Sequence, residues 1–406
     1  LLLCPIICMF SLFGCSEDTE EPVNYEEMSA QLTAGSQRRG FGVLKELYGQ
    51  KRDENLFISP LSISIALAMT YNGAAGETQK AMAHALEWED MSLGEVNETY
   101  EKLIEDLELS DPDVRLSLAN SLWARVDRTF HEECIGRIRE YYDAEFDTLD
   151  FIGDPQGSID VINAWVSEKT EDKIPDLLKE LPPFTALILV NTIYFKGGWT
   201  VKFDPADTHD GSFHLLDGST KQVPMMHQRQ APFPIFKGDN FSSTRIPYGD
   251  GRICMYIFLP DSDFSIQEFV EQLGTTEWRR WTRQLNLMAE GARMGGIELS
   301  MPRFKIEYDA ELKDALTNLG MGEAFSPEAD FSELGPLPLW ISQVKHGAFV
   351  EVNEEGTEAT AATAVIMVDS SDWDPTRFIV DRPFFFAIQD DVTGAVLFAG
   401  VVVEPM

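Results

Sequence analysis

Residues 352–364 read VNEEGTEATAATA, and the chain carries no charge from Ala359 to Val368 although acidic residues flank that run. Successive side chains of a β-strand point to opposite faces, so odd- and even-numbered residues separate. The even-numbered set here contains Glu358, whereas the odd-numbered set is small or apolar. The odd-numbered set is Thr357, Ala359, Ala361, Thr363, Val365 and Met367. One face of such a strand can be buried without burying a charge. Taken alone, the run also fits an ordinary strand or a loop of Ala and Thr.

Helices are predicted in the first half of the chain. Ser59 suits an N-cap, Pro60 suits the first helical position, and Gly73 suits the end of a helix with apolar residues at helical spacing. Further helices are expected at residues 78–88, 96–109, 131–146 and 157–174.

Strands dominate from residue 186 onward. Apolar or alternating runs predict strands at 186–199, 252–260, 296–309, 346–356, 377–390 and 394–405, interrupted by one helix at 310–321. Helices first and strands later predict an α+β fold with large, mostly antiparallel or mixed sheets. Neither a linker nor a repeat divides residues 30–406, so we interpret them as one domain.

The composition limits the classes of partner. Sixty-eight Asp and Glu against 32 Lys and Arg give a formal net charge of -36, which argues against nucleic acid and anionic membrane surfaces. A hydrophobic content of 44% is ample for a large core.

The N-terminal residues indicate export. Residues 1–15 are an apolar run too short to span a membrane, and they end in Leu-Phe-Gly-Cys, which resembles a bacterial lipobox. That resemblance implies a lipid-modified Cys15 and a protein that is secreted or anchored to the cell envelope. Cleavage without lipidation is the alternative. The acidic residues 16–29 would then be a disordered tether.

A search for catalytic or metal-binding chemistry gives little. HExxH, zinc-ligand spacing, a P-loop, G-x-G-x-x-G and G-x-S-x-G are all missing from the sequence, so it predicts neither a metal nor a cofactor. Ser342 and Lys345 have the S-x-x-K spacing of penicillin-recognising enzymes, but the companion motifs are missing. Cys254 lies in an apolar run and is expected to be a buried thiol, and its pairing with Cys134 has no support. We therefore expect no catalytic residue.

Seven blocks in order carry a resemblance to a known family. They are residues 55–78, 189–199, 246–261, 299–321, 324–332, 346–364 and 378–388, the last of which includes DRPF at 381–384. Together they resemble the serpin family over roughly residues 30–405. The resemblance implies the serpin fold with an exposed reactive-centre loop, and a monomeric inhibitor that acts as a suicide substrate. The target protease cleaves the loop, forms an acyl-enzyme, and is trapped when the loop inserts as a new strand in the main sheet.

The resemblance also assigns roles to residues in this sequence. It implies a hinge formed by Glu355, Gly356, Thr357, Glu358, Ala359, Thr360, Ala361, Ala362 and Thr363. It implies a polar "shutter" cluster under the centre of the main sheet, formed by Ser59, Ser62, Asn191 and His346. It places Trp199 at the "breach", the end of the sheet where insertion begins.

Counting from the hinge glycine as in the family places the reactive bond between Ser370 and Ser371, with Asp369, Val368 and Met367 as alternatives. The interval between Lys345 and Arg377 lacks Lys and Arg, which argues against a trypsin-like target. An elastase-like or subtilisin-like serine protease is expected, with a cysteine protease as the alternative.

Two further expectations concern other partners and other functions. Residues 94–111, which match the heparin-binding helix of some family members, are acidic, so we expect no heparin dependence. A non-inhibitory serpin with a binding or chaperone-like role is the alternative function.

Overall fold

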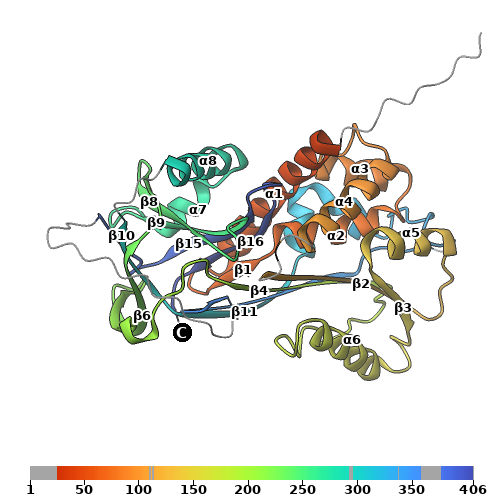
Figure 1. Cartoon of the computed structure of the whole chain (residues 1–406). Coiled ribbons are helices and arrows are strands. Elements are labelled where there is room, and N and C mark those ends of the chain that lie inside the picture. The colour runs from red at the N-terminus through yellow and green to blue at the C-terminus, as the bar shows by residue number, and fades with distance from the viewer. Residues whose placement is uncertain are drawn as a thin grey trace, which may run out of the picture.

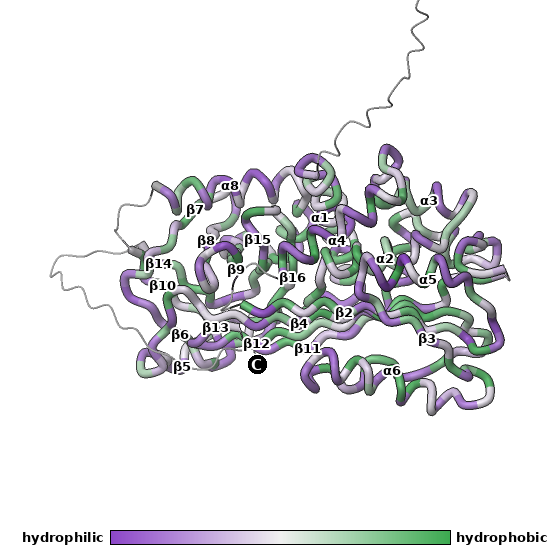
Figure 2. The backbone as a smooth tube through the Cα atoms, turned by 45° about the vertical axis from the view of Figure 1, so that its right-hand side comes forward, coloured by the Kyte–Doolittle hydropathy of each residue, from purple (hydrophilic) through white to green (hydrophobic). Residues whose placement is uncertain are grey.

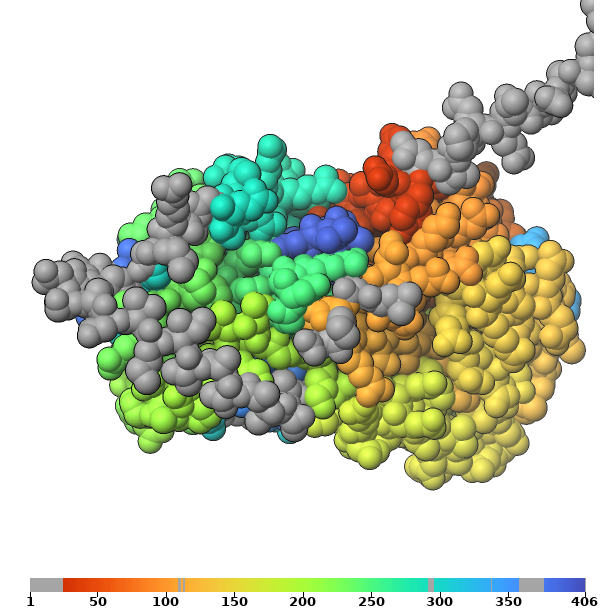
Figure 3. All heavy atoms as spheres, in the orientation of Figure 1, coloured from red at the N-terminus to blue at the C-terminus, as the bar shows by residue number. Residues whose placement is uncertain are grey.

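The computed structural model describes residues 25–108, 111, 114–291, 296–336, 338–357 and 376–405. In Figure 1, α1 to α5 lie over one face of the main sheet and α6 lies against its other face. The first half of the chain occupies one half of the visible surface in Figure 3. The helices are α1 (Tyr25–Gln50), α2 (Pro60–Tyr71), α3 (Gly76–Leu86), α4 (Leu93–Glu108), α5 (Glu132–Tyr142), α6 (Pro155–Lys169), α7 (Ile266–Gln272), α8 (Thr275–Gly291) and α9 (Lys313–Leu316).

The strands form three sheets. The main sheet has the order β11 (Phe304–Glu311), β12 (Gln343–Asn353), β13 (Gly356–Thr357), β4 (Leu187–Gly198), β2 (Val114–Arg125), β3 (Glu145–Leu149). The second sheet has the order β1 (Leu56–Ile58), β16 (Val396–Val402), β15 (Phe384–Asp390), β9 (Ile253–Pro260), β8 (Phe241–Pro247), β7 (Ile235–Lys237). The third has the order β14 (Thr376–Ile379), β10 (Ile297–Pro302), β6 (Thr220–Ala231), β5 (His209–His214). This architecture confirms the predicted α+β class with antiparallel and mixed sheets.

Helix α2 begins as its sequence predicts. Ser59 has extended backbone angles, its hydroxyl accepts a hydrogen bond from the Ser62 N–H, and Pro60 is the first helical residue. Every residue of the helix is buried. It therefore lies in the middle of the molecule, where it can support the main sheet.

The main sheet is buried on both faces. Along β4, Leu187, Leu189 and Ile193 belong to the large core beneath the helices. Ile188 and Val190 belong instead to a smaller core that includes Ile162 and Val166 of α6. A strand with apolar residues on both faces explains the unbroken apolar run in its sequence.

The structure corrects the N-terminal boundary. Residues 25–29, predicted to belong to a disordered tether, form the first turns of the 26-residue helix α1. Tyr25 donates a hydrogen bond to Asp106 of α4 (3.2 Å), and Ser29 and Leu32 are buried one turn apart. These contacts outweigh the acidic composition, so the folded domain begins by residue 25 rather than 30. The predicted leader at 1–15 and the rest of the tether up to residue 24 lie outside the described residues.

The predicted helix at 310–321 is wrong in its first part. Ala310 and Glu311 extend β11 and pair with His346 and Lys345 of β12. Only Lys313–Leu316 is α-helical, followed by a short irregular helical turn. Pairing with a neighbouring strand overrode the local helical preference of these residues.

The described part of the chain includes no helix long and apolar enough to cross a membrane. Cys134 and Cys254 are both buried and unpaired, as expected from the sequence for Cys254.

Candidate functional site

The main sheet opens at one end to admit a two-residue strand. Over part of their length, β12 and β4 are direct neighbours and pair in parallel, from Gln343 opposite Ile188 to Ala348 opposite Ile193. Beyond that point β13 lies between them, antiparallel to both. Figure 2 shows β13 beside β4 and β12, towards the end of the sheet opposite β3. The residues that lead into residues 358–375 therefore already occupy a strand position.

Gly356 is required at its position by a close backbone approach. Its φ is +145°, and a Cβ built there would lie 2.1 Å from the carbonyl oxygen of Gly197. Any side chain would push β13 away from β4, because that distance is far inside van der Waals contact. The glycine allows the chain to turn from β12 into the gap between the two strands.

Thr357 points into the large core. It pairs with Val352 on one side and Gly197 on the other, and directly paired residues share a face of the sheet. Val352 belongs to the core beneath the helices, and Thr357 itself is 0% exposed. The Thr357 and Tyr248 hydroxyls form a hydrogen bond of 2.8 Å, which satisfies both buried groups.

Trp199 lies against the start of this strand. Its backbone N–H donates to the Glu355 carbonyl (2.9 Å), and its indole Nε1 donates to the Asn353 carbonyl (2.9 Å). The ring stacks on Tyr248 with centroids 4.4 Å apart. Trp199 therefore fixes the turn between β12 and β13.

The two carboxylates of that turn, Glu354 and Glu355, are held by neighbouring side chains. Arg303 and Thr208 donate hydrogen bonds of 2.7 and 2.5 Å to the nearly buried carboxylate of Glu354. Burial acts to raise the pKa of Glu354, but these hydrogen bonds outweigh it and the pKa lies below its usual value. Lys202 pairs with Glu355 at 2.7 Å. Glu354 was missed at the sequence level because its acidic neighbours gave it no distinguishing signal.

The four residues assigned to the shutter meet in one buried network. His346 on β12 lies opposite Asn191 on β4, and its Nδ1 donates to Asn191 Oδ1 at 2.7 Å. The Asn191 amide donates to the Ser62 carbonyl (3.0 Å) and hydroxyl (2.5 Å). The Ser59 backbone N–H donates to His346 Nε2 at 3.1 Å. Because Nε2 accepts, the proton must be on Nδ1, so the ring is neutral.

Asn120 extends this network and was not predicted. It lies opposite Asn191 on the neighbouring strand β2, and its Oδ1 accepts a hydrogen bond of 2.6 Å from the Asn191 amide. Polar side chains thus form a row across β12, β4 and β2, on the face of the sheet that contacts the N-terminus of α2. The row joins the two strands that would have to separate if the sheet took up a longer strand.

Because His346 is neutral in the folded protein, we expect the free energy of unfolding to decrease at acidic pH. Burial lowers its pKa from 6.5 to about 3. Below pH 6.5 His346 becomes protonated in the unfolded chain, whereas in the folded protein it stays neutral down to about pH 3. Protonation therefore favours the unfolded state, and the free energy of unfolding decreases as the pH falls from 6.5 towards 3. Between pH 7 and pH 5 this group alone should lower the free energy of unfolding by about 2 kcal/mol.

Denaturant unfolding at pH 7 and pH 5 measures that loss. His346→Asn should show a smaller decrease than the unmodified protein over this range. His131→Asn, at an exposed position, is the matched control and should keep the full decrease. An identical pH dependence for the His346 variant would contradict the assignment.

Several predicted residues lie outside the described part of the chain. They are Glu358, Ala359, Thr360, Ala361, Ala362 and Thr363 of the hinge, the reactive-bond candidates Met367, Val368, Asp369, Ser370 and Ser371, and Cys15. Their roles stay predictions.

The S-x-x-K pair lies at the start of β12, with Ser342 directly before the strand and Lys345 within it. The Ser342 hydroxyl accepts a hydrogen bond from the Ala186 N–H (3.0 Å) at the start of β4. Lys345 forms an ion pair with Glu311 of β11 (3.2 Å). Each side chain has a structural partner, Ser342 next to β4 and Lys345 on β11. Among the residues that the structure describes, no group of three or more His, Cys, Asp or Glu side chains is placed to hold a metal ion.

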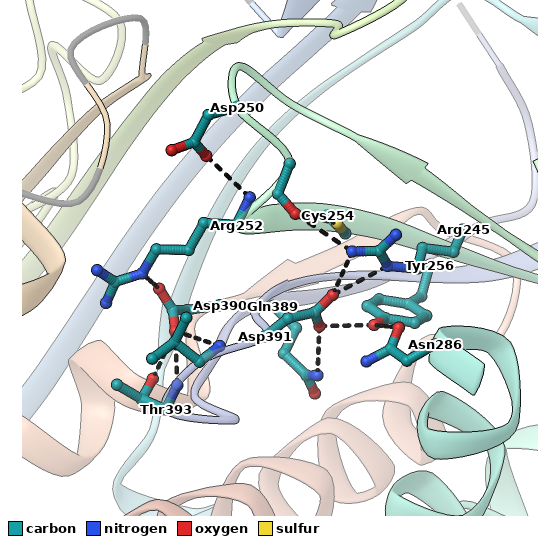
Figure 4. Close-up of polar contacts among 12 residues, drawn as sticks. Arg245, Asp250, Arg252, Cys254, Tyr256, Asn286, Gln389, Asp390, Asp391 and Thr393 are labelled. Carbon is teal, nitrogen blue, oxygen red and sulfur yellow. Dashed lines mark hydrogen bonds and ion pairs between the residues drawn. The ribbon is translucent and has the colours of Figure 1, made fainter. Parts of the chain in front are cut away.

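A second polar cluster lies between the second sheet and α8, and its side chains bond to one another (Figure 4). Arg245 donates two hydrogen bonds to Asp391 (2.9 and 2.8 Å), which also accepts from Tyr256 (2.6 Å) and Gln389 (2.9 Å). Cys254 lies beside this cluster, and burial raises the pKa of its thiol well above the usual value. The cluster satisfies buried groups, and the thiol is not an activated nucleophile.

The comparisons with known proteins agree with this geometry. The family model described as "Serpin (serine protease inhibitor)" matches residues 34–405. Serpin B6 of Pongo abelii is 37% identical, covering 88% of this chain and 95% of its own. The leukocyte elastase inhibitor of Bos taurus is 36% identical, covering 92% of this chain and 100% of its own.

Solved structures give the same result. Human thyroxine-binding globulin superposes with a TM-score of 0.85 at 27% identity, covering 93% of this chain and 100% of that one. The native state of the thermophilic serpin Tengpin gives a TM-score of 0.82 at 28% identity, covering 93% and 94%. The fold, the sequence blocks and these matches coincide over almost the whole length, and this chain belongs to the serpin family of serine protease inhibitors.

Proposed function

We propose that this protein inhibits a serine protease as a suicide substrate, and that the protease attacks the reactive-centre loop between Ser370 and Ser371. The observation that carries the proposal is β13. Gly356 and Thr357 already lie between the parted strands β12 and β4, with Thr357 buried in the core. They occupy the position that the first residues of an inserting strand need.

The registers on the two sides of β13 are consistent with longer insertion. Continued along β4 and along β12, both registers place position 363 between Asn191 and His346. Insertion would therefore break the hydrogen bond between those two side chains. The hydroxyl of Thr363, on the odd-numbered face, could replace the lost partner.

The proposed chemistry uses only the catalytic residues of the protease. Its serine attacks the carbonyl of Ser370, the bond to Ser371 breaks, and the protein remains attached as an ester. Insertion of roughly 14 residues at about 3.3 Å each would then carry the enzyme about 45 Å. Distortion of the protease's oxyanion hole at the far end would prevent ester hydrolysis.

The residues of the reactive-centre loop indicate which class of protease is the target. Lys and Arg are missing between Lys345 and Arg377, and Ser370 suits a shallow primary pocket. The relative from Bos taurus is named as an inhibitor of leukocyte elastase. We therefore propose an elastase-like or subtilisin-like target.

Mixing the protein with elastase, subtilisin and trypsin tests the function. An SDS-stable complex is expected with elastase or subtilisin and not with trypsin, and the released C-terminal peptide should begin at Ser371. A peptide that begins at Ser370, Asp369 or Val368 would instead place the bond after Asp369, Val368 or Met367, respectively. Cleavage without a complex by every protease that cuts the loop would refute inhibition and favour the non-inhibitory alternative.

We also propose that the protein acts outside the cytoplasm, anchored through a lipid on Cys15. The lipobox-like sequence supports this proposal. Expression in a bacterial host with a labelled fatty acid should label the protein. Cys15→Ser should abolish the label, and equal labelling of both would exclude the anchor.

A further inference from the structure

Three of the six histidines of the chain lie on one β-hairpin of the third sheet. They are His209 and His214 on β5 and His227 on β6. The two strands are antiparallel, with His209 opposite Met225 and His214 opposite Thr220. Side chains two residues apart on a strand share a face, so His227 lies diagonally across from His209 on one face, and His214 lies on the other. We call His209 and His227 the histidine pair.

The two rings of the histidine pair are close enough to share a metal ion. Their centroids are 6.2 Å apart and their planes are tilted by 42°. A zinc ion lies about 2.0–2.1 Å from each ligating nitrogen, so two imidazoles that hold one ion have centroids roughly 5–6.5 Å apart. The hairpin turn separates the two residues in sequence, and only the register of β5 on β6 brings them together. A short spacing motif therefore does not mark them.

A buried hydroxyl orients the ring of His227. Ser300 of β10 lies opposite His227 and is 2% exposed, and its Oγ lies 2.6 Å from His227 Nδ1. The hydroxyl can accept a hydrogen bond from Nδ1–H, which leaves the lone pair of Nε2 for a metal ion. Histidines that ligate metals almost always have such a hydrogen bond on the other ring nitrogen, because it fixes the tautomer and the ring orientation.

The ring of His209 is available for coordination. Its side chain is exposed, and among the residues that the structure describes no hydrogen bond or ion pair involves this ring. The ring can therefore turn towards an ion without breaking a polar contact. The net charge of -36 favours the approach of cations. Imidazole ligands suit Zn²⁺ and Cu²⁺, whereas Mg²⁺ and Ca²⁺ prefer oxygen.

We propose that the histidine pair binds one Zn²⁺ or Cu²⁺ ion, with water at the remaining coordination positions. The ion would link β5 to β6, and β6 is joined through β10 to β14. In Figure 2 these four strands lie together at one end of the molecule. Directly before His209, the Thr208 hydroxyl donates to Glu354 in the turn that leads into β13 (2.5 Å). Metal binding would therefore stabilise β5, whose preceding residue contacts this turn. The site does not depend on the proposed inhibition.

Calorimetric titration of the metal-free full chain with Zn²⁺, and separately with Cu²⁺, tests the site. The unmodified protein should bind one ion that is lost in His209→Gln and in His227→Gln, each with at least about tenfold weaker affinity. Ser300→Ala, which keeps both ligands but removes the orienting hydroxyl, should weaken binding about tenfold. His214→Gln is the matched control, because this exposed histidine lies on the other face of the same hairpin, and it should bind as the unmodified protein does.

Thermal unfolding gives a second measurement on the same variants. An ion that binds only the folded protein, at a hundred times its dissociation constant, should raise the thermal midpoint by at least about 2 °C. The increase is expected for the unmodified protein and for His214→Gln, and it should be missing in His209→Gln and His227→Gln. Equal affinity in all variants would place the ion on other groups and overturn the inference. Binding that requires millimolar metal would mean an adventitious ion only and would overturn it as well.

Discussion

Replacing Thr357 with arginine is expected to turn the protein from an inhibitor into a substrate. The Thr357 side chain is fully buried, and its hydroxyl is satisfied by Tyr248. A guanidinium at this position would be buried without a partner, at a cost of several kcal/mol. Even about 3 kcal/mol would slow insertion about a hundredfold, because 1.4 kcal/mol corresponds to a factor of ten. The acyl-enzyme would then hydrolyse before the loop could insert.

The stoichiometry of inhibition measures this competition. Thr357→Arg should consume at least about ten times more inhibitor per protease than the unmodified protein, while the rate of loop cleavage stays the same. Glu358→Arg is the matched control, because an even-numbered side chain would face the outside of the sheet. Unchanged stoichiometry for Thr357→Arg would count against insertion as the mechanism.

The burial of Thr357 could be predicted because it depends on local alternation alone, whereas the other odd-numbered residues, from Ala359 to Met367, lie outside the described residues and stay a prediction. The odd-numbered face was identified by its lack of charge, and Thr357 lies opposite Val352 and Gly197 on the buried face. The buried helix α2 was predicted for a similar reason, since its cap and proline are adjacent in sequence. Features that depend on residues adjacent in sequence can therefore be predicted without knowing the tertiary contacts.

Residues that act through tertiary contacts could not be predicted from local patterns. Asn120 lies within an apolar strand and becomes part of the shutter only because β2 pairs with β4. Tyr248 meets Thr357 across 109 positions of sequence. The start of α1 was missed because its acidic residues suggested a solvated tether, whereas Tyr25 anchors it to Asp106. Long-range pairing decided each of these cases.

Replacing Asn191 with alanine is expected to give the largest loss of stability in the sheet. Its side chain accepts from His346 and donates to Ser62 and Asn120, and all four residues are buried. Removal leaves a buried ring N–H and two buried oxygens unsatisfied, each costing about 1–3 kcal/mol. The free energy of unfolding should therefore fall by about 3–5 kcal/mol.

The position of Asn191 gives this variant a second effect. The lost hydrogen bond between Asn191 and His346 links the side chains of β4 and β12 in the part of the sheet where these strands pair directly. Gly356 and Thr357 lie between the same two strands further along the sheet. With that contact removed the strands should separate more easily, so a peptide copy of residues 357–370 should insert faster. Chemical unfolding and peptide-binding kinetics measure the two effects. Asn318→Ala, whose side chain bonds Glu46 at the exposed surface, should change stability by less than about 0.5 kcal/mol. Loss of stability without faster peptide uptake would mean that the polar row supports the core and does not control the opening between β4 and β12.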